Sequence, residues 1–173
     1  INVSSPNTPG LRALQQREEL EAILAAIREA APGHPPLLLK IAPDLSPEDL
    51  EAVCEVALAE KLDGLIAGNT TISRPESLRS PKKSETGGLS GRPLFALSTE
   101  VLRQAHRLTG GRLTLIGQEN GRLRVDGASL VQLYSALVYE GPGLIRRIKE
   151  ELAALLERDG FASVAEAVGS DAG

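Results

Sequence analysis

Residues 37–49 read LLLKIAPDLSPED, and this stretch decides the fold. Its first five residues form an apolar run broken only by Lys40, which is typical of a strand buried on both faces of a parallel sheet. Ser46 then supplies an N-cap hydroxyl, and Pro47 suits the first position of a helix. A buried strand followed at once by a capped helix predicts a parallel α/β fold. Lys40 is the anomaly, because an unpaired buried ammonium is energetically costly.

The same unit recurs along the chain. Helical spacing of apolar side chains predicts helices over residues 17–31, 46–61, 98–108 and 143–158. Continuous apolar runs predict strands over residues 37–41, 64–67, 113–116 and 129–133. A further strand is expected to end in the first residues of the chain. Successive strand–helix units of this kind predict an α/β domain with a parallel sheet.

Composition narrows the class of protein. The chain has 173 residues, of which 42% are hydrophobic, as in a globular domain with a real core. Its net charge of -4 gives no support for nucleic-acid binding. Cys54 is the single cysteine, so neither an internal disulfide nor a four-thiolate metal site is available. No apolar run reaches the roughly 20 residues of a membrane span, and no signal peptide is recognisable.

Polar side chains cluster at the start of the chain. Residues 1–10 read INVSSPNTPG, in which two prolines and a glycine follow a strand-like beginning. Residues before a proline adopt extended geometry, so a stiff loop presents several amides and hydroxyls. Such a loop suits a small polar ligand, and one hydroxyl could accept a proton if the site tunes it. Taken alone, the composition favours a proline-rich turn or a disordered terminus.

Three polar clusters follow directly after strands, at residues 2–8, 68–71 and 134–135. In a barrel of eight strand–helix units all strand ends meet on one face, where active sites lie. The long loop that carries GGLSG at 87–91 is a further candidate, because long ordered loops are more often functional than idle. Each piece alone has a plainer interpretation: a turn, a flexible connector, or a buried lysine paired with a carboxylate.

The sequence offers little for other chemistry. It has no Gly-x-Gly-x-x-Gly dinucleotide motif and no phosphate-loop lysine motif. His34 lies among prolines and His106 on a predicted helix, so both are expected to be solvated or structural, and we expect no metal site. Cys54 falls on the apolar face of a predicted helix and is expected in the core.

Five stretches together resemble one known family. They are NVSSPNTPGLR at 2–12, KIAPDL at 40–45, NTT at 69–71, GGLSG at 87–91 and GASLVQLY at 127–134. In this order and spacing they are similar to the dihydroorotate dehydrogenase family through nearly the whole chain. The resemblance implies a (β/α)8 TIM barrel, of which this chain is the C-terminal half or slightly more. Residues 1–173 would form a single partial FMN-binding barrel domain, and the chain, which lacks an initiator Met, is expected to be a fragment.

The resemblance also implies a reaction. Members of this family use FMN to oxidise (S)-dihydroorotate to orotate in pyrimidine (UMP) biosynthesis. Ser5 matches the catalytic base that takes the C5 proton, and Thr8 would assist the proton transfer. Class 1 relatives carry cysteine at that position, so serine indicates class 2, whose members pass electrons to a quinone. A free serine is a weak base, so the site must activate it by hydrogen bonding and desolvation.

Other residues acquire roles from the same resemblance. Those implied to bind dihydroorotate or orotate are Asn2, Asn7, Asn69 and Thr70. Those implied to bind FMN are Asn2, Lys40, Gly68, Ser90, Gly91, Tyr134 and Ser135. Neutral amides can donate and accept hydrogen bonds along a pyrimidine edge. A lysine beside the flavin N1/O2 edge would stabilise reduced flavin, which accounts for the anomalous Lys40.

The resemblance extends to the setting of the enzyme. Class 2 members contact a membrane peripherally, at the cytoplasmic face of a bacterial inner membrane or at the mitochondrial inner membrane. Their N-terminal helices form the quinone tunnel and the membrane contact, and we expect those helices to lie outside this chain. The expected partners are therefore dihydroorotate, orotate and a quinone.

The chain departs from the family pattern in two places. Gly68 stands where a flavin-contacting threonine is usual, and the lost hydroxyl contact would weaken binding by about 1 kcal/mol. Residues 117–127 read GQENGRLRVDG, where the family carries a Val-Gly-Gly-Val phosphate loop followed by a helix. Asn120-Gly121 is a hairpin signal, and Glu119 would repel the FMN phosphate. We expect an abbreviated strand–helix unit here.

Two alternatives stay open on the sequence alone. An incomplete barrel leaves open sheet edges, so the chain could be a non-catalytic or truncated remnant of the enzyme. It could also be another FMN-barrel oxidoreductase that acts on a dihydropyrimidine or dihydrouridine. Those relatives typically use cysteine as the acid or base, which Ser5 argues against.

Overall fold

A computed structural model describes residues 1–118 and 127–170 of the chain. Its centre is a parallel sheet in which four strands lie side by side in sequence order. The strands are β1 (Leu38–Ile41), β2 (Gly64–Ala67), β3 (Thr114–Gln118) and β4 (Leu130–Gln132). The predicted parallel α/β sheet is confirmed.

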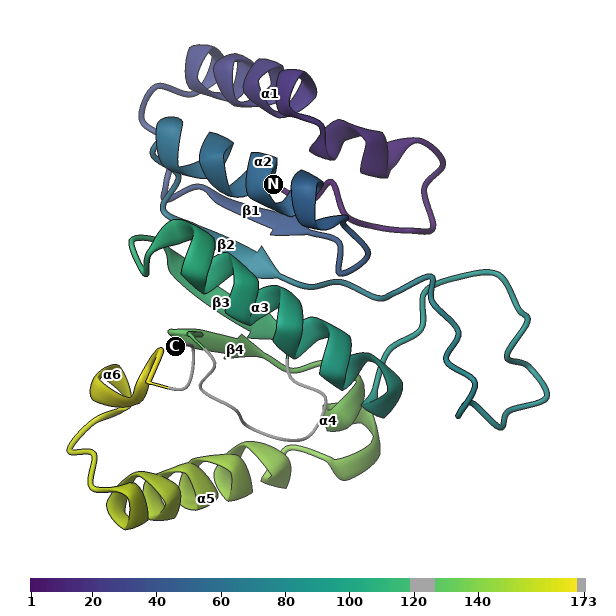
Figure 1. Ribbon diagram of the computed structural model, residues 1–173, viewed down its shortest axis with the longest axis vertical. Helices are drawn as coiled ribbons and strands as arrows, with labels where there is room; N and C mark the ends of the chain where they lie inside the picture. The colour runs from purple at the N-terminus through teal and green to yellow at the C-terminus, as the bar shows by residue number, and fades with distance from the viewer. Residues whose placement is uncertain (119–126, 171–173) are drawn as a thin grey trace.

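Four longer helices lie before, between and after the strands in the part of the chain that the structure describes. They are α1 (Arg17–Ala30), α2 (Pro47–Ala59), α3 (Phe95–Thr109) and α5 (Gly143–Asp159). Figure 1 shows α1, α2 and α3 lying across one side of the sheet, with α5 beyond β4. Helices that cover one side of a parallel sheet in strand order are the arrangement expected for part of a strand–helix barrel.

Most element ends lie within one or two residues of the sequence-based expectation. Helix α3 begins at Phe95 rather than at Ser98, because the 3-10 turn η2 (Arg92–Leu94) leads straight into it. The expected opening strand is reduced to one parallel bridge between Asn2 and Lys40. Short elements were missed, since too few residues show a period; they are η1 (Leu11–Gln15), α4 (Ser135–Glu140) and α6 (Val164–Ala167).

Local chemistry explains the β1–α2 unit. Ser46 Oγ accepts a hydrogen bond from Asp49 N at 3.1 Å and donates to the Asp49 carboxylate at 3.0 Å. Pro47 occupies the first helical position, where its missing N–H is no loss. The apolar face of α2 then packs on the sheet, where Leu39 and Ile41 are fully buried. The capped helix therefore fixes the loop between β1 and α2.

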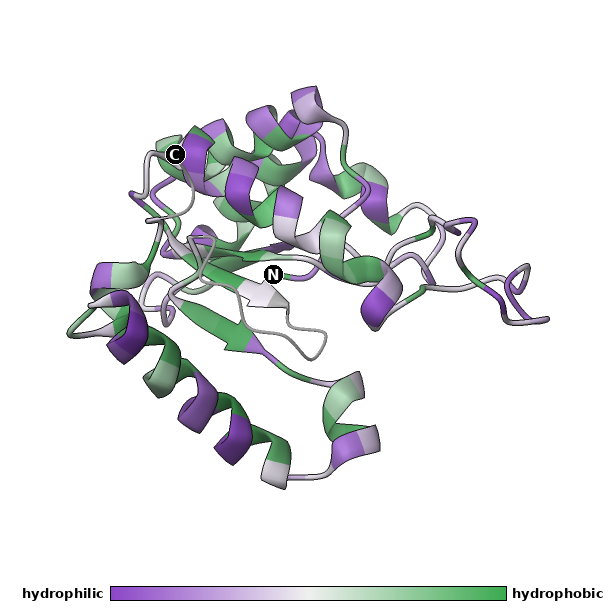
Figure 2. Ribbon diagram, turned by 60° about the horizontal axis from the view of Figure 1, so that its bottom comes forward, coloured by the Kyte–Doolittle hydropathy of each residue, from purple (hydrophilic) through white to green (hydrophobic). Residues whose placement is uncertain are grey.

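The two faces of the sheet differ in burial. Leu39 belongs to the core cluster under the helices, whereas Lys40 points to the opposite face because side chains alternate along a strand. Lys40 shares that face with its register partners Ile66 and Ile116, and all three are half-buried. Figure 2 shows apolar residues along the strands and on the side of α5 that is turned toward β4. Leu130 of β4 is nonetheless 58% exposed, so this edge strand is poorly covered.

The strands β3 and β4 pair in parallel, with Ile116 opposite Leu130. Parallel neighbours usually need a crossover of a dozen residues or more. Residues 119–129 join these two strands, so the connection is short. The hairpin signal at 120–121 and Glu119 lie outside the described residues. The expected abbreviated unit is therefore still followed by a fourth strand, β4, that pairs in parallel with β3.

Cys54 and His106 are packed against other parts of the protein, as expected for side chains with a structural role. Cys54 is buried in the core, and desolvation, aided by the Glu51 charge, raises the pKa of its thiol to about 12. His106 packs against Gly127 and Gly169, where an added Cβ would approach ring atoms to 2.5 and 2.7 Å. None of the described helices is long and apolar enough to cross a membrane.

Replacing Gly64 with alanine should destabilise the protein. A Cβ at Gly64 would lie 2.3 Å from the Thr114 carbonyl oxygen, so β2 and β3 would have to move apart. We expect the free energy of unfolding in urea to fall by about 1–3 kcal/mol. Gly33→Ala is the matched control, because no atom lies within 4 Å of its added Cβ. Equal effects of the two variants would contradict the close strand spacing.

Candidate active site

The opening loop starts beside β1. Lys40 N donates to the Ile1 carbonyl oxygen at 2.8 Å, and Asn2 forms a parallel bridge with Lys40. At the other end of the loop, Gly10 has a φ of +74°, a left-handed conformation that glycine adopts without strain. The 3-10 turn η1 follows at once. The loop is therefore held at both ends.

Ser4 joins this loop to the residues after β2. Its side chain is fully buried, and its hydroxyl donates to Asn2 Oδ1 and accepts from Asn69 Nδ2, each at 2.8 Å. Asn69 Oδ1 accepts in turn from Thr70 N at 2.7 Å. Three of the predicted substrate-binding residues thus lie in one hydrogen-bonded group. The sequence did not single out Ser4, because nothing in a run of polar residues marks the one that is buried.

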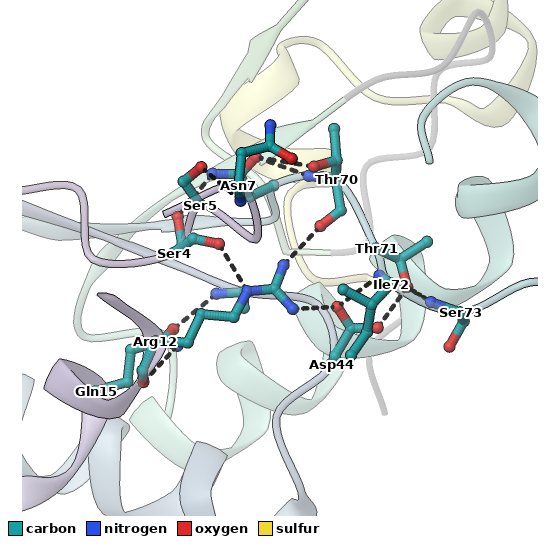
Figure 3. A network of polar contacts seen from close by, with 12 residues as sticks. Ser4, Ser5, Asn7, Arg12, Gln15, Asp44, Thr70, Thr71, Ile72 and Ser73 are labelled. Atoms are coloured by element: carbon teal, nitrogen blue, oxygen red, sulfur yellow. Dashed lines mark hydrogen bonds and ion pairs between the residues drawn. The ribbon is translucent and has the colours of Figure 1, made fainter. Parts of the chain in front are cut away.

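Arg12 lies at the centre of the site, as Figure 3 shows. Its guanidinium donates to the carbonyl oxygens of Ser4 at 3.0 Å and Thr70 at 2.8 Å. It also forms an ion pair with Asp44 at 2.8 Å, in which the side chains are only 21% and 13% exposed. One side chain therefore ties together the opening loop, the β1–α2 loop and the β2–α3 loop. Arg12 and Asp44 were not predicted site residues, although both fall within the stretches that carry the family resemblance.

Asp44 and Gln15 secure the neighbouring backbone. The Asp44 carboxylate accepts hydrogen bonds from the Thr71 hydroxyl and from Ile72 N, the latter at 3.2 Å. Gln15 is buried, and its Oε1 accepts from Ala42 N at 2.8 Å. Thr71, Gln15 and Ala42 are buried, so the bonds to them satisfy polar groups that water reaches poorly, which makes the loop arrangement specific.

The long loop between β2 and α3 folds back on this group. Thr71 and Leu89 form an antiparallel bridge, with Thr71 N donating to the Leu89 carbonyl oxygen at 3.0 Å. Arg74 crosses the loop and donates to carbonyl oxygens on both of its arms: Thr71, Ile72, Ser73, Lys83, Glu85 and Gly87. A Cβ at Gly88 would lie 1.8 Å from Thr70 Oγ1, so the returning arm touches the site.

Ser5, Asn7 and Thr8 lie along the same opening loop. Ser5 is half-buried, and its Oγ accepts a hydrogen bond from Asn7 N at 3.3 Å. The Asn7 Oδ1 atom lies 3.7 Å from the position of a Cβ on Gly87, so Asn7 sits against the long loop. Thr8 is exposed, and no hydrogen bond joins its hydroxyl to Ser5 within the described part of the chain.

Lys40 is half-buried on the face of the sheet opposite α1, α2 and α3, which is called the open face below. Desolvation lowers the pKa of its ammonium below the usual 10.5. Its Nζ lies 3.5 Å from Oε1 of the neutral Gln132, and no carboxylate pairs with it among the described residues. The plainer interpretation of a lysine paired with a carboxylate finds no support in the part of the chain that the structure describes. A partly desolvated cation of this kind favours an anionic ligand.

The other predicted cofactor residues are more scattered. Ser90 Oγ and Ser135 Oγ are 3.1 Å apart, so the end of the long loop meets the start of α4. Gly68 and Gly91 have φ values of +128° and +79°, at which any side chain is strained, so a threonine would fit poorly at Gly68 here. Tyr134 is 79% exposed. In residues 1–118 and 127–170, no cluster of His, Cys, Asp and Glu is suited to a metal ion.

A family model for dihydroorotate dehydrogenase matches residues 1–156. The chain belongs to the dihydroorotate dehydrogenase family. It is 57% identical to the dihydroorotate dehydrogenase (quinone) of Azorhizobium caulinodans, over 98% of this chain and 52% of that protein. The mitochondrial dihydroorotate dehydrogenase (quinone) of Oryza sativa subsp. japonica is 55% identical, over 99% of this chain and 40% of that protein. The chain thus spans about half the length, or less, of these relatives.

Solved structures of the family share the fold. The ligand-free dihydroorotate dehydrogenase of Eimeria tenella aligns with a TM-score of 0.92 at 41% identity, over 99% of this chain and 54% of that one. The predicted resemblance and the partial (β/α)8 barrel are thereby confirmed. The alignment with the Azorhizobium protein covers 184 positions for a chain of 173 residues, so that relative carries residues that this chain lacks.

The Arg12–Asp44 pair should stabilise the fold more than an exposed ion pair does. A double-mutant cycle with Arg12→Ala and Asp44→Ala should give a coupling energy of about 1–3 kcal/mol in urea denaturation, because the pair is shielded from water. The exposed pair Arg17–Glu55 is the matched control and should give less than about 1 kcal/mol. A coupling energy no larger than the control value would show that Arg12 does not hold the loops together.

Proposed function

We propose that this chain supplies the substrate side of a dihydroorotate dehydrogenase (quinone), within a single partial FMN-binding barrel domain of residues 1–173. The reaction is the FMN-dependent oxidation of (S)-dihydroorotate to orotate with a quinone as electron acceptor, in de novo pyrimidine (UMP) biosynthesis. The observation that carries the proposal is the assembly of Asn2, Asn69 and Thr70 around Ser4, with Ser5 next along the loop. Membership of the family supports the class of reaction.

Ser5 is the proposed catalytic base. Oxidation of dihydroorotate requires an oxygen that accepts the C5 proton as the hydride equivalent leaves C6. Asn7 N donates to Ser5 Oγ at 3.3 Å, and a hydrogen bond of this kind stabilises negative charge on the serine oxygen. Thr8 is the proposed helper that passes the proton toward solvent, which suits its exposed position.

Amides hold the substrate in this proposal. The proposed substrate-binding residues are Asn2, Asn7, Asn69 and Thr70, which come from the opening loop and from the loop after β2. Because Arg12 donates to both loops, the two halves of this set keep a fixed separation. A fixed separation matters because a pyrimidine ring is rigid and its polar groups cannot adjust to displaced partners.

The residues on the open face of the sheet fit FMN. When bound, FMN would take the hydride equivalent from C6 of the substrate. Among residues 1–118 and 127–170, the side chain that Lys40 Nζ contacts is the neutral Gln132, so its charge suits the N1/O2 edge of the flavin in this proposal. The contact between Ser90 and Ser135 brings together two more proposed ligands. The proposed set is completed by Asn2, Gly68, Gly91 and Tyr134.

A quinone is the proposed electron acceptor. Serine at the position of the base supports this choice, and several relatives are named dihydroorotate dehydrogenase (quinone). A quinone is lipid-soluble, so we infer peripheral contact with a membrane, through an N-terminal region of the kind that class 2 members carry. The membrane would be a bacterial inner membrane, at its cytoplasmic face, or the mitochondrial inner membrane.

Ser5→Ala should abolish most of the activity while leaving ligand binding intact. In the complete natural protein that contains this chain, we expect kcat for dihydroorotate-dependent quinone reduction to fall by about 10²–10⁴-fold, because the base is lost. The dissociation constant of orotate should change by less than about threefold, since the amides remain. Ser73→Ala, at an exposed position of the long loop, is the control and should retain full activity.

Three results, one from this variant and two from assays of the wild-type protein, would count against the proposal. Unchanged kcat in the Ser5→Ala protein would remove Ser5 as the base. Preference of the wild-type protein for dihydrouracil would favour a different dihydropyrimidine oxidoreductase. Absence of bound FMN and of orotate binding in the wild-type protein would favour a non-catalytic remnant.

Lys40→Met should raise stability and weaken FMN binding. Folding lowers the pKa of Lys40, so its charged form opposes folding at every pH below that lowered value. The FMN-free variant should therefore have a higher Tm at pH 7, and the gain should fade as the pH rises through the lowered pKa and disappear above 10.5. FMN should bind the variant at least about tenfold more weakly. The exposed Lys61→Met is the control, and equal FMN affinity of the two variants would exclude the cofactor role.

A further inference from the structure

The Ser4 hydroxyl forms hydrogen bonds with two side-chain amides of the candidate site. We propose that it holds Asn2 and Asn69 with their N–H groups toward the ligand, which makes the site selective for hydrogen-bond acceptors. The inference rests on the dihydroorotate site proposed above and adds the rule by which that site would choose its ligand. Ser4 is a positioning residue in this account, because it acts through the two asparagines.

The single hydroxyl hydrogen of Ser4 fixes the arrangement. The Asn69 Nδ2 group can only donate, so the Ser4 oxygen accepts from it at 2.8 Å. The Ser4 hydrogen is then free to donate to Asn2 Oδ1, also at 2.8 Å. If either amide turned over, one of these two bonds would lose its donor or its acceptor. Because Ser4 is fully buried, water could not replace the lost partner.

Backbone N–H groups also hold the Asn2 and Asn69 amides in this orientation. Asn69 Oδ1 accepts from Thr70 N at 2.7 Å, so a turned Asn69 amide would place two N–H groups against each other. Asn2 Oδ1 accepts from Ser4 N at 3.3 Å in addition to the Ser4 hydroxyl. Both amide oxygens are therefore occupied within the protein.

The groups that remain for a ligand are donors. Asn2 Nδ2 has no hydrogen-bond partner in the described part of the chain, and Asn69 Nδ2 has a second hydrogen beyond the one given to Ser4. A ring carbonyl or a carboxylate can accept these hydrogens, and (S)-dihydroorotate carries both kinds of group. An amino or amide nitrogen in the same place would oppose N–H to N–H and leave polar groups unpaired.

Binding measurements test this selectivity. The probes are orotate, its 4-amino analogue, in which an amino group replaces the C4 carbonyl oxygen, and its carboxamide, in which an amide replaces the carboxylate. In the complete natural protein, at least one analogue should bind about 10²-fold more weakly than orotate. Ser4→Ala should reduce that preference at least about tenfold, because each amide then keeps only its backbone hydrogen bond and turns over more readily to present its oxygen. Ser98→Ala, which removes another buried serine hydroxyl, should leave the preference unchanged.

A preference that is the same in the Ser4→Ala and wild-type proteins would overturn the proposal, even if overall affinity falls. A loss of affinity alone is what a merely structural role would produce. If Ser4→Ala fails to fold, Ser4→Cys keeps most of the volume with a weak donor and gives the same comparison.

A second readout separates this proposal from the proposed function. In the ligand-free protein, the Asn69 side-chain NH₂ signals should show slow hydrogen exchange, and Ser4→Ala should accelerate it at least about tenfold. Unchanged exchange would refute the role of Ser4 whatever the ligand. Accelerated exchange together with no binding of orotate to the wild-type protein would instead refute the dihydroorotate site.

Discussion

The guanidinium of Arg12 is the interaction on which the site depends. It donates to the carbonyl oxygens of Ser4 and Thr70 and pairs with Asp44, so three loops that are distant in sequence share one fixed centre. Arginine suits this place because its planar group carries several donors in a rigid fork. The sheet brings the loops to the same end of the strands, but the loops carry few buried apolar side chains. Their relative position therefore depends on polar contacts that Arg12 organises.

The candidate site has two chemical environments, and Asn2 connects them. Around Ser4 lie neutral amides and hydroxyls, which suit a polar ring. On the open face of the sheet lies Lys40, a half-buried cation beside the neutral Gln132. The backbone bridge between Asn2 and Lys40 places the two environments side by side. This proximity is consistent with the proposed part of Asn2 in holding both the substrate and the cofactor.

Much of the fold could be predicted because its signals are local. The apolar run at β1 and the Ser46 cap identify their elements within a few residues, and the structure confirms both. The short α4 could not be predicted, since one or two turns show no period. The parallel pairing of β4 with β3 is a long-range contact that depends on the whole sheet, and the hairpin signal after β3 lies outside the described residues.

The site could be predicted only in part, because many of its contacts join residues that are far apart in the sequence. The resemblance to the family was enough to nominate Ser5 and the asparagines, whose roles remain predictions. The importance of Ser4 and Arg12 could not be predicted, because it depends on partners far along the chain, such as Asn69 and Asp44. Burial turns an ordinary serine into the link between two amides, and only the folded structure shows that burial.

The most direct test of this account is a crystal structure of the complete natural protein with orotate. We expect the ring to lie within about 3 Å of the side-chain nitrogens of Asn2 and Asn69, through its acceptor atoms, with C5 facing Ser5 Oγ. The Arg12 contacts to both loops should be unchanged from those seen here. Orotate bound elsewhere, or bound with Asn2 and Asn69 turned away from it, would contradict the account.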